Sequence, residues 1–465
     1  MSQSSACVSH PLAGVKLISG IQYGEPPVGP LRFAPPRLAR WNSLEADQST
    51  DAVIAPQTPS RLSTVMGDFT NAQSEDCLNL SVWTREGSDQ RGLRPVLFWL
   101  HGGAFMSGGG ALDWYDGSTL CSEGDIVVVS PNYRLGALGF LFQPHLSPGN
   151  LGLLDAELAL RWTRENIREF GGDPDRITVM GQSAGAWMAA LMAARMDVDS
   201  PSIHQLILQS GPLGIPPTKP ENAQKMAEYF LNGLAANKDQ SAGNVLAREA
   251  SVHDVLSAQG AAIRTAGLSF TEPGRPPVPF GPVSDGTQLP SHVGYSRFLA
   301  NAAARVPVLA GWTLDEMSAF NPVERASPES AANANAAAAV FEAPLAKWAM
   351  HARAAGKAAF IYSFDWAPKD SAFGACHCID LPFTFGTLRA FSTAPMLGAV
   401  PSATLEQLSS QVRSAWLAFV KWGDPNKAEY ADRLPHWPGF DAAAATVMHI
   451  DHQSHLARLT VEPTI

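Results

Sequence analysis

The chain has 465 residues, 45% of them hydrophobic and 16% charged, which provides enough apolar material for a large core and argues against a disordered protein. The formal net charge of −10 argues against a nucleic-acid partner, because a phosphate backbone is bound by a concentrated basic surface. The opening segment MSQSSACVSHPLAG lacks the basic and apolar regions of a signal peptide, and no apolar run is long enough to cross a bilayer. We therefore expect no membrane anchor.

The cysteines are five in number and form no CxxC pair; they stand at positions 7, 77, 121, 376 and 378. A disulfide framework needs paired cysteines and an oxidising compartment. The pattern therefore favours free thiols and a cytoplasmic location.

Strand-like and helix-like segments alternate through the first half of the chain. PVLFWL (95–100) and DIVVVS (125–130) are short β-rich runs bounded by turn residues. Apolar residues at helical spacing predict a helix over 155–170, which the following GGDP ends. Strands predicted at 176–181 and 204–211 are separated by the apolar, Ala-rich stretch 184–196. This order predicts right-handed crossovers and a largely parallel, doubly wound α/β sheet.

The second half is less regular. Segments 306–312 and 358–364 are predicted late strands, while the Ala-rich segment 331–340 and the segment 408–422 are predicted helices. No repeat of 20–50 residues occurs, which argues against a solenoid or a propeller.

The cover of the site is expected from two regions. Residues 216–300 mix helical stretches with Pro-rich breaks, and residues 317–350 are the second candidate region. We expect one α/β domain over residues 1–465, with helices from these two regions lying over the site.

GQSAG (181–185) is the only G-x-S-x-G in the chain. It follows a predicted strand and opens a helix, as a nucleophile elbow requires. In such an elbow the serine lies on a strained turn with its hydroxyl exposed, and the glycines allow the backbone and helix to approach closely. Ser183 is therefore the candidate nucleophile, and an ordinary Gly-rich turn is the alternative.

HGGAF (101–105) directly follows the strand PVLFWL. Its small residues let backbone N–H groups point into a cavity, which is what the oxyanion of an acyl-transfer reaction needs. A helix-breaking turn is the alternative, but the pairing with an elbow about 80 residues later favours the first interpretation.

These motifs together resemble the type-B carboxylesterase/cholinesterase family, whose members include bacterial para-nitrobenzyl esterases. The resemblance covers nearly the whole chain and implies an α/β-hydrolase fold and a serine carboxylesterase that uses no cofactor and no metal. The segments that carry it, in the family's order, are GIQYGEPPVGPLRFAPP (20–36), SEDCLNLSVWT (74–84), NYRLGALGFL, GNLGLLDAELALRW, FGGDPDRITVMGQSAGA and AWLAFVKWGDPN (415–426).

The resemblance implies roles for individual residues. Ser183 would be the nucleophile, Glu316 in WTLDEMSAF (312–320) the acid, and His377 in FGACHCIDLPFTFG (373–386) the base. The order Ser, Glu, His agrees with the chain order of α/β-hydrolases. Backbone N–H groups of three residues would form the oxyanion hole: Gly103, Ala104 and Ala184. Two structural ion pairs are also implied: Arg32 with Glu75, and Arg134 with Asp155.

Each assignment has a rival in the sequence. Asp315 is also a carboxylate after a strand, and only the family register favours Glu316. A metal site at Cys376-His377-Cys378 is disfavoured, because adjacent residues in a strand point to opposite faces and a fourth ligand is missing. The other candidate bases are His351, His436, His449, His452 and His455.

Two departures from the family bear on the site. The usual disulfide partner of Cys77 is replaced by Ala55, so that disulfide cannot form. The stretch from Glu316 to His377 is only 61 residues and looks compressed, which affects the shape of the cover.

The implied substrate is a small-molecule ester, with small to medium alkyl or aryl groups. The motifs do not distinguish the leaving group, so an amidase or carbamate hydrolase with the same triad stays open. A non-enzymatic binding protein of the same fold is disfavoured by the presence of all three triad residues. A choline ester is disfavoured because the loop 56–75 holds only Phe69 as an aromatic residue.

Three aromatic residues, Phe105, Trp187 and Phe383, would line an apolar substrate pocket or equally belong to the core. The small residues at 102–104 resemble the family's open version of the oxyanion loop, which predicts hydrolysis of tertiary-alcohol esters. Gly103→Val should then abolish turnover of tertiary esters before primary ones.

Overall fold

The computed structural model describes residues 12–40, 51–87, 92–196, 202–236, 243–267, 278–323, 327–399, 402–427 and 433–459. The strands within these ranges are β1 Val15–Gln22, β2 Asn79–Arg85, β3 Arg94–Leu100, β4 Val127–Pro131, β5 Phe142–Gln143, β6 Ser147–Pro148, β7 Gly172–Gln182, β8 Gln205–Gln209, β9 Val308–Thr313, β10 Ala359–Phe364, β11 Thr446–Ile450 and β12 His455–Arg458. The α-helices are α1 Ser63–Met66, α2 Ser118–Gly124, α3 Gly136–Phe140, α4 Leu151–Asn166, α5 Ala184–Arg195, α6 Pro220–Ala236, α7 Gly243–Glu249, α8 Val252–Ala266, α9 His292–Ala303, α10 Pro328–Ala337, α11 Ala343–Ala354, α12 Leu381–Phe385 and α13 Ser402–Trp422.

A ten-stranded sheet runs through the described part of the chain in the order β1-β2-β4-β3-β7-β8-β9-β10-β11-β12. The strands from β4 to β11 pair in parallel, while β1, β2 and β12 pair antiparallel at the two edges. Every residue of β3, β4, β9 and β10 is buried, as expected for parallel strands covered on both faces. The predicted doubly wound α/β architecture is confirmed.

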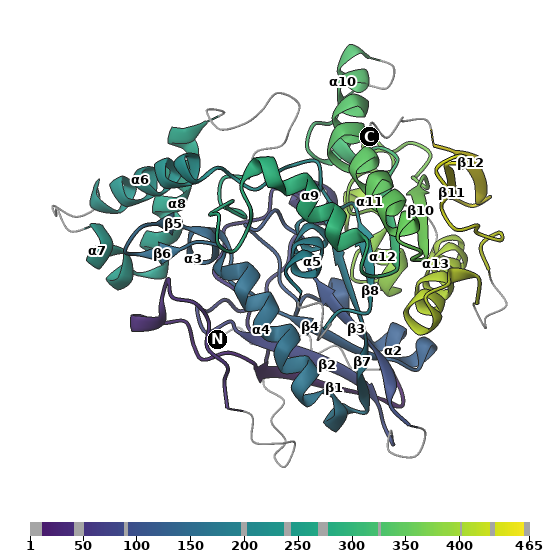
Figure 1. Cartoon of the computed structure of the whole chain (residues 1–465), viewed down its shortest axis with the longest axis horizontal. Helices are drawn as coiled ribbons and strands as arrows, with labels where there is room; N and C mark the ends of the chain where they lie inside the picture. The colour runs from purple at the N-terminus through teal and green to yellow at the C-terminus, as the bar shows by residue number, and fades with distance from the viewer. Residues whose placement is uncertain are drawn as a thin grey trace.

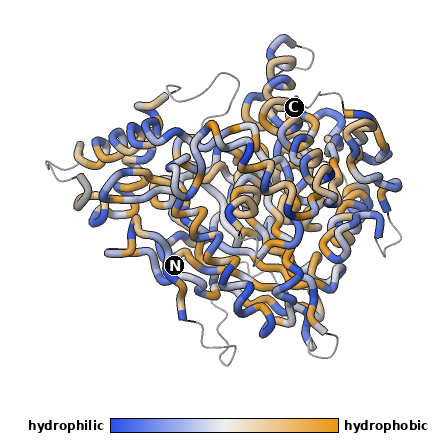
Figure 2. Tube along the Cα trace, viewed as in Figure 1, coloured by the Kyte–Doolittle hydropathy of each residue, from blue (hydrophilic) through white to orange (hydrophobic). Residues whose placement is uncertain are grey.

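The two faces of the sheet form two hydrophobic clusters. Because successive strand residues point to opposite faces, Phe98 of β3 belongs to the cluster that includes α4 and α5, whereas Trp99 belongs to the cluster that includes α12 and α13. Helices α4, α5 and α9 lie in front of the sheet (Figure 1), and hydrophobic segments concentrate where the central strands lie (Figure 2). Helix α5 is buried at every position from Ala184 to Ala194, which explains its Ala-rich and apolar composition.

Helices from both predicted cover regions extend beyond the sheet. Helices α6, α7 and α8 group on one side of the molecule, and α10 and α11 lie on another (Figure 1). The first group and α9 come from the predicted region 216–300, and the second falls largely within the predicted region 317–350.

Element bounds differ from the sequence expectation mainly at helix ends. Helix α4 begins at Leu151 instead of 155, and its last predicted turn is a 3-10 helix at Ile167–Phe170. The predicted Ala-rich helix is α10 followed by a π-helix at Ala338–Glu342. Helix α13 begins at Ser402, six residues before the predicted start. Within the described ranges, no helix combines the length and the apolar composition that a membrane span requires.

Both implied ion pairs are present; Arg134–Asp155 is buried and Arg32–Glu75 is partly buried. Arg32 donates to both oxygens of Glu75, with an Nε–Oε2 distance of 2.7 Å, and Arg134 donates to Asp155 at 2.7 and 2.8 Å. Arg32 also donates to three backbone carbonyls of α7 and the residue that follows it, which ties this helix to the N-terminal segment. These pairs have the architectural role that the sequence predicted.

Candidate active site

Ser183 lies at the sharp turn between β7 and α5. Its φ of 56° and ψ of −125° are strained for a residue with a side chain. The flanking glycines are required by contact: a Cβ at Gly185 would lie 2.0 Å from the carbonyl oxygen of Leu100, and one at Gly181 would lie 2.4 Å from Gly185. Ser183 is 8% exposed and lines a cavity, so the turn has the geometry of the predicted nucleophile elbow.

Glu316 and His377 form a fully buried pair. Glu316 begins a 3-10 helix just after β9, and its Oε1 accepts a hydrogen bond of 3.0 Å from the Thr313 backbone N–H. Its Oε2 forms a short hydrogen bond with His377 Nδ1. With Glu316 ionised, His377 carries its proton on Nδ1 and leaves Nε2 free to accept one.

Two phenylalanine rings enclose the imidazole of His377. The ring of Phe320 lies 5.1 Å and that of Phe341 lies 5.5 Å from it, measured between centroids. These contacts restrict the orientation of the imidazole and exclude water from one side of the pair.

The rival residues have other partners. The carboxylate of Asp315 accepts a hydrogen bond of 2.9 Å from the Ala375 backbone N–H. His449 pairs with Asp365 at 2.7 Å, and His452 accepts from the Trp366 indole at 2.9 Å. The geometry therefore favours Glu316 over Asp315 as the partner of His377, in agreement with the family register.

The Nε2 side of His377 faces Gln182. The two Nε2 atoms are 3.2 Å apart, and with Nδ1 protonated the Gln182 amide donates to the imidazole. The same amide lies 3.3 Å from Cys378 Sγ. Within the described ranges, no hydrogen bond joins Ser183 Oγ to His377, a contact that often tightens only when substrate is bound.

The segment after β3, which contains the candidate oxyanion-hole residues and is called the oxyanion loop below, forms a tight turn. Gly103, Ala104 and Phe105 have φ values of 109°, 54° and 60°, three consecutive residues in the left-handed region. The Gly103 carbonyl accepts from the N–H groups of Met106 and Ser107, which closes the turn. Among the described residues, no acceptor is bonded to the N–H of Gly103, Ala104 or Ala184, so all three can donate to a ligand.

Two residues that the sequence did not single out hold this loop. His101 contacts the Gly102 carbonyl through Nδ1 at 2.8 Å, and its ring stacks on Tyr133 at 4.2 Å. Burial lowers the pKa of His101 to about 4, so it is neutral at physiological pH. Gln57 exchanges hydrogen bonds of 2.6 and 2.7 Å with the backbone of Gly108. Gln57 has little sequence signal because it lies about 50 residues from Gly108, whereas His101 stands at the start of the HGGAF motif.

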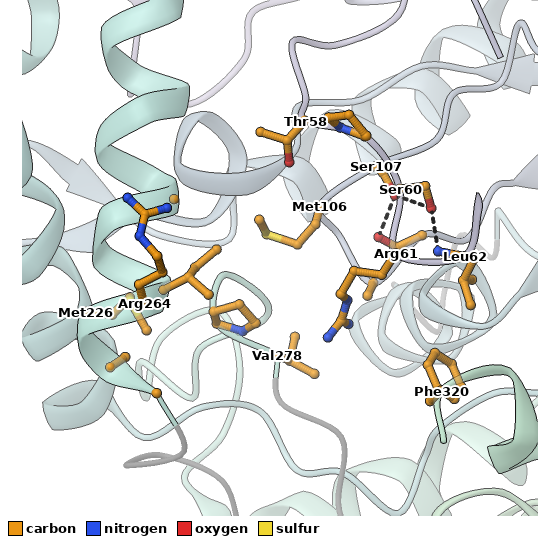
Figure 3. Close-up of a pocket in the computed structure, with 18 of the residues that line it drawn as sticks. Thr58, Ser60, Arg61, Leu62, Met106, Ser107, Met226, Arg264, Val278 and Phe320 are labelled. Carbon is orange, nitrogen blue, oxygen red and sulfur yellow. Dashed lines mark hydrogen bonds between the residues drawn. The ribbon is translucent and has the colours of Figure 1, made fainter. Parts of the chain in front are cut away.

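Ser183 opens into a cavity of about 470 Å³. The loop 58–62, the oxyanion loop, α6, α8 and Phe320 line it (Figure 3). Its size is within the usual range for small-molecule sites.

Of the two roles left open for Phe105, Trp187 and Phe383, lining of this cavity is not observed. Phe105 packs against Trp187 and the Trp187 indole donates to Tyr295, while Phe383 packs against the ring of Trp366. All three are at most 1% exposed. These side chains belong to the hydrophobic core. The segments that carry the motif residues also pack against the sheet, so a side chain next to a motif residue can point into the core.

Two further carboxyl groups interact electrostatically with the Glu316–His377 pair. Burial raises the pKa of Asp380 to about 6, against the lowering effect of a 2.7 Å hydrogen bond from Gln209. Burial and the charge of Glu316 raise the pKa of Glu342 to about 7. Elsewhere in the described ranges, no three His, Cys, Asp or Glu side chains are grouped to hold a metal ion.

Comparisons with known proteins find similar sequences and similar solved structures. The sequence matches the model of the carboxylesterase family over residues 8–338 and 326–463. It is 38% identical to a probable N-octanoylanthranilate hydrolase of Rhodococcus erythropolis, over 88% of this chain and 89% of the relative. It is 33% identical to the para-nitrobenzyl esterase of Bacillus subtilis, over 95% and 92%. The solved structure of a thermophilic PNB esterase superposes with a TM-score of 0.82 at 28% identity, covering 96% of this chain and 94% of that one.

Proposed function

This chain belongs to the carboxylesterase family, and from that premise we propose that it hydrolyses carboxylic esters through Ser183, His377 and Glu316 by way of an acyl-enzyme. The observation that carries the proposal is the buried Glu316–His377 hydrogen bond beside a strained Ser183 that opens into a cavity.

In the proposed first half-reaction, Ser183 Oγ attacks the ester carbonyl while His377 Nε2 takes the hydroxyl proton. Glu316 keeps the Nδ1–H tautomer and stabilises the transient imidazolium. The tetrahedral oxyanion accepts hydrogen bonds from the N–H groups of Gly103, Ala104 and Ala184. His377 then returns the proton to the leaving alcohol.

The second half-reaction repeats these roles with water. His377 removes a proton from water as it attacks the acyl-enzyme, and the acid product leaves with Ser183 restored. Before the first attack, His377 Nε2 must exchange its contact with Gln182 for one with Ser183 Oγ, which requires one of these side chains to move.

The test is covalent labelling with a fluorophosphonate probe. One label per chain is expected, on Ser183. Ser183→Ala should abolish labelling and lower kcat on p-nitrophenyl butyrate by about 10⁴-fold or more. Ser107 offers a matched control, because it also lines the cavity, and Ser107→Ala should keep the label. Labelling at another serine, or full turnover by Ser183→Ala, would contradict the proposal.

A second candidate is hydrolysis of an N-acyl compound at the same triad. It is favoured by the 38% identity to a relative named for an N-octanoyl substrate. p-Nitrophenyl esters of increasing acyl length, measured beside octanoyl anilide, separate the two activities. A kcat/KM for the anilide equal to or above that of the octanoate ester would favour the N-acyl reaction.

A further inference from the structure

The charged side chains on the described wall of the Ser183 cavity are both positive. Among its described lining residues the charged side chains are Arg61 and Arg264, and none is an aspartate or glutamate. The other side chains of the wall include Leu62, Met106, Ile263 and Phe320. Uncharged polar side chains such as Thr58, Thr218 and Asn222 also line the wall, so its described part holds two cations and no anion, in a chain with a net charge of −10. This composition points to a ligand with an anionic group and an apolar part.

Arg61 is the better placed of the two arginines. It lies just before α1 on the loop 58–62, and among the described residues no acceptor is bonded to its guanidinium. Its side chain is directed into the open space toward Val278, on the side of the cavity where Phe320 lies, whereas the guanidinium of Arg264 points away from Val278 (Figure 3).

Arg61 is an exposed residue, so its guanidinium is accessible from the cavity. Protein packed around the guanidinium lowers its pKa by desolvation, and no carboxylate of the described residues acts against this effect. An arginine nevertheless stays charged at physiological pH, so a cation without a described ionic partner faces the cavity. A bound anion would supply the missing partner, and a carboxylate matches the two parallel N–H groups of a guanidinium.

Phe320 connects this side of the cavity to the catalytic base. It lines the cavity with Arg61, and its ring lies 5.1 Å from the imidazole of His377. We propose, on the basis of the ester hydrolysis proposed above, that Arg61 is a specificity residue that binds a carboxylate on the substrate. The preferred substrates are then monoanionic esters, with the carboxylate on either the acyl half or the alcohol half.

The test compares matched anionic and neutral substrates. The p-nitrophenyl monoester of adipic acid, with p-nitrophenyl hexanoate as its neutral partner, places the carboxylate on the acyl half. 4-Butanoyloxybenzoate, with 4-butanoyloxybenzamide as its neutral partner, places it on the leaving group. For each pair the preference is the ratio of kcat/KM for the anionic ester to that for the neutral one.

Arg61→Gln should lower this preference by about 10- to 100-fold in at least one pair, mainly through KM, because a hydrogen bond to a charged group is lost. Arg61→Lys should restore part of the preference, since it keeps the charge without the paired N–H groups. Added salt should reduce the preference of the unmodified enzyme. The control Arg161→Gln removes an equal charge from the exposed surface of α4 and should leave both ratios unchanged.

A preference that stays within about threefold of the unmodified enzyme in both pairs would overturn the inference. Melting temperatures show whether Arg61→Gln is folded, and Arg61→Lys gives a second measurement that does not remove the charge. Turnover of neutral p-nitrophenyl hexanoate separates the two proposals. If this ester is cleaved normally without an Arg61 effect on the ratios, only the specificity inference fails. If no ester is cleaved by the unmodified enzyme, the proposed function fails and this inference fails with it.

Discussion

A Cβ atom at Gly103 would lie 1.9 Å from the carbonyl oxygen of Ser107. Gly103 also has a φ of 109°, a conformation that L side chains rarely adopt. The oxyanion loop is a closed turn at this point, and a side chain of any size at position 103 would displace the backbone of Ser107. Position 103 therefore requires glycine so that the loop can fold, whatever the size of the substrate.

Gly103→Ala should consequently reduce hydrolysis of all esters together. Displacing the loop moves the N–H groups of Gly103 and Ala104, and loss of one oxyanion donor lowers kcat by about 10²- to 10³-fold. This result replaces the sequence-based expectation that Gly103→Val acts first on tertiary esters. The measurement compares kcat/KM for ethyl, isopropyl and tert-butyl acetate. Ala104→Gly is the matched control: a glycine adopts the φ of 54° at position 104 without strain and should keep activity.

Glu316→Gln and Asp315→Asn should have very different effects. The glutamine can hold the wrong tautomer of His377, so kcat should fall by about 10³-fold or more. The Asp315 carboxylate binds the Ala375 backbone instead, and an asparagine oxygen can accept the same hydrogen bond. We expect less than about a tenfold loss for Asp315→Asn, from electrostatics. Equal losses in steady-state kinetics would contradict the assignment of Glu316.

The site was predictable where its residues lie in continuous motifs. In GQSAG and HGGAF, the tight turn permits only small residues at certain positions. Gly185, for example, lies too close to Leu100 to carry a side chain, so the turn can be recognised from the sequence. The choice of Glu316 over Asp315 required the alignment with the family motif, because a single sequence does not distinguish two adjacent carboxylates after a strand. Similarly, the parallel strands were found because their apolar runs are buried on both faces.

The cavity wall was not predictable from the sequence. Arg61, Met226 and Arg264 meet there from a loop and two helices that are far apart in the chain. The sequence analysis considered aromatic residues near the motifs as pocket residues. In the structure, Phe105 and Trp187 pack against each other in the core. An aromatic residue beside a motif looks the same in the sequence whether it packs in the core or lines the cavity. Only the folded structure distinguishes these two positions.

The described cysteines should behave as unreactive free thiols. Cys77, Cys121, Cys376 and Cys378 are buried and form no disulfide, while Cys7 lies outside the described residues. Burial raises the pKa of Cys121 and Cys376 to about 12, and it raises that of Cys77 and Cys378 as well. Ellman's reagent should react slowly with these four thiols in the folded protein and titrate five thiols in urea without reductant. A titre of three would reveal a disulfide and weaken the predicted cytoplasmic location.

Asp380 should make the protein less stable as pH rises. Burial raises its pKa to about 6 in the folded state, above its ordinary value of 3.8. The folded protein therefore holds a proton that the unfolded chain releases, and stability falls between about pH 4 and pH 6, by up to about 3 kcal/mol. Asp380→Asn should remove this part of the pH dependence of the urea midpoint. The exposed Asp370→Asn is the control, and an unchanged pH dependence in Asp380→Asn would contradict the prediction.

Gln182 contacts Nε2 of His377, the proposed base, at 3.2 Å, so a charge at position 182 should change the pH dependence of activity. A neutral amide donates to Nε2 and favours the neutral imidazole, whereas a carboxylate at the same place would favour the imidazolium. Because the proposed base must be neutral to accept the Ser183 proton, Gln182→Glu should move the acidic limb of the kcat/KM profile to higher pH, by about 1–2 pH units.

The pH profile for p-nitrophenyl butyrate distinguishes this effect from simple disruption of the site. A disrupted site lowers the whole profile without moving its acidic limb, whereas a charge beside His377 moves the limb and lets activity recover at high pH. Gln182→Met is the matched control: it removes the donor without adding a charge, so it should move the acidic limb much less than Gln182→Glu does. A shift of the acidic limb to lower pH in Gln182→Glu would mean that the side chain at position 182 does not face Nε2 in the working enzyme.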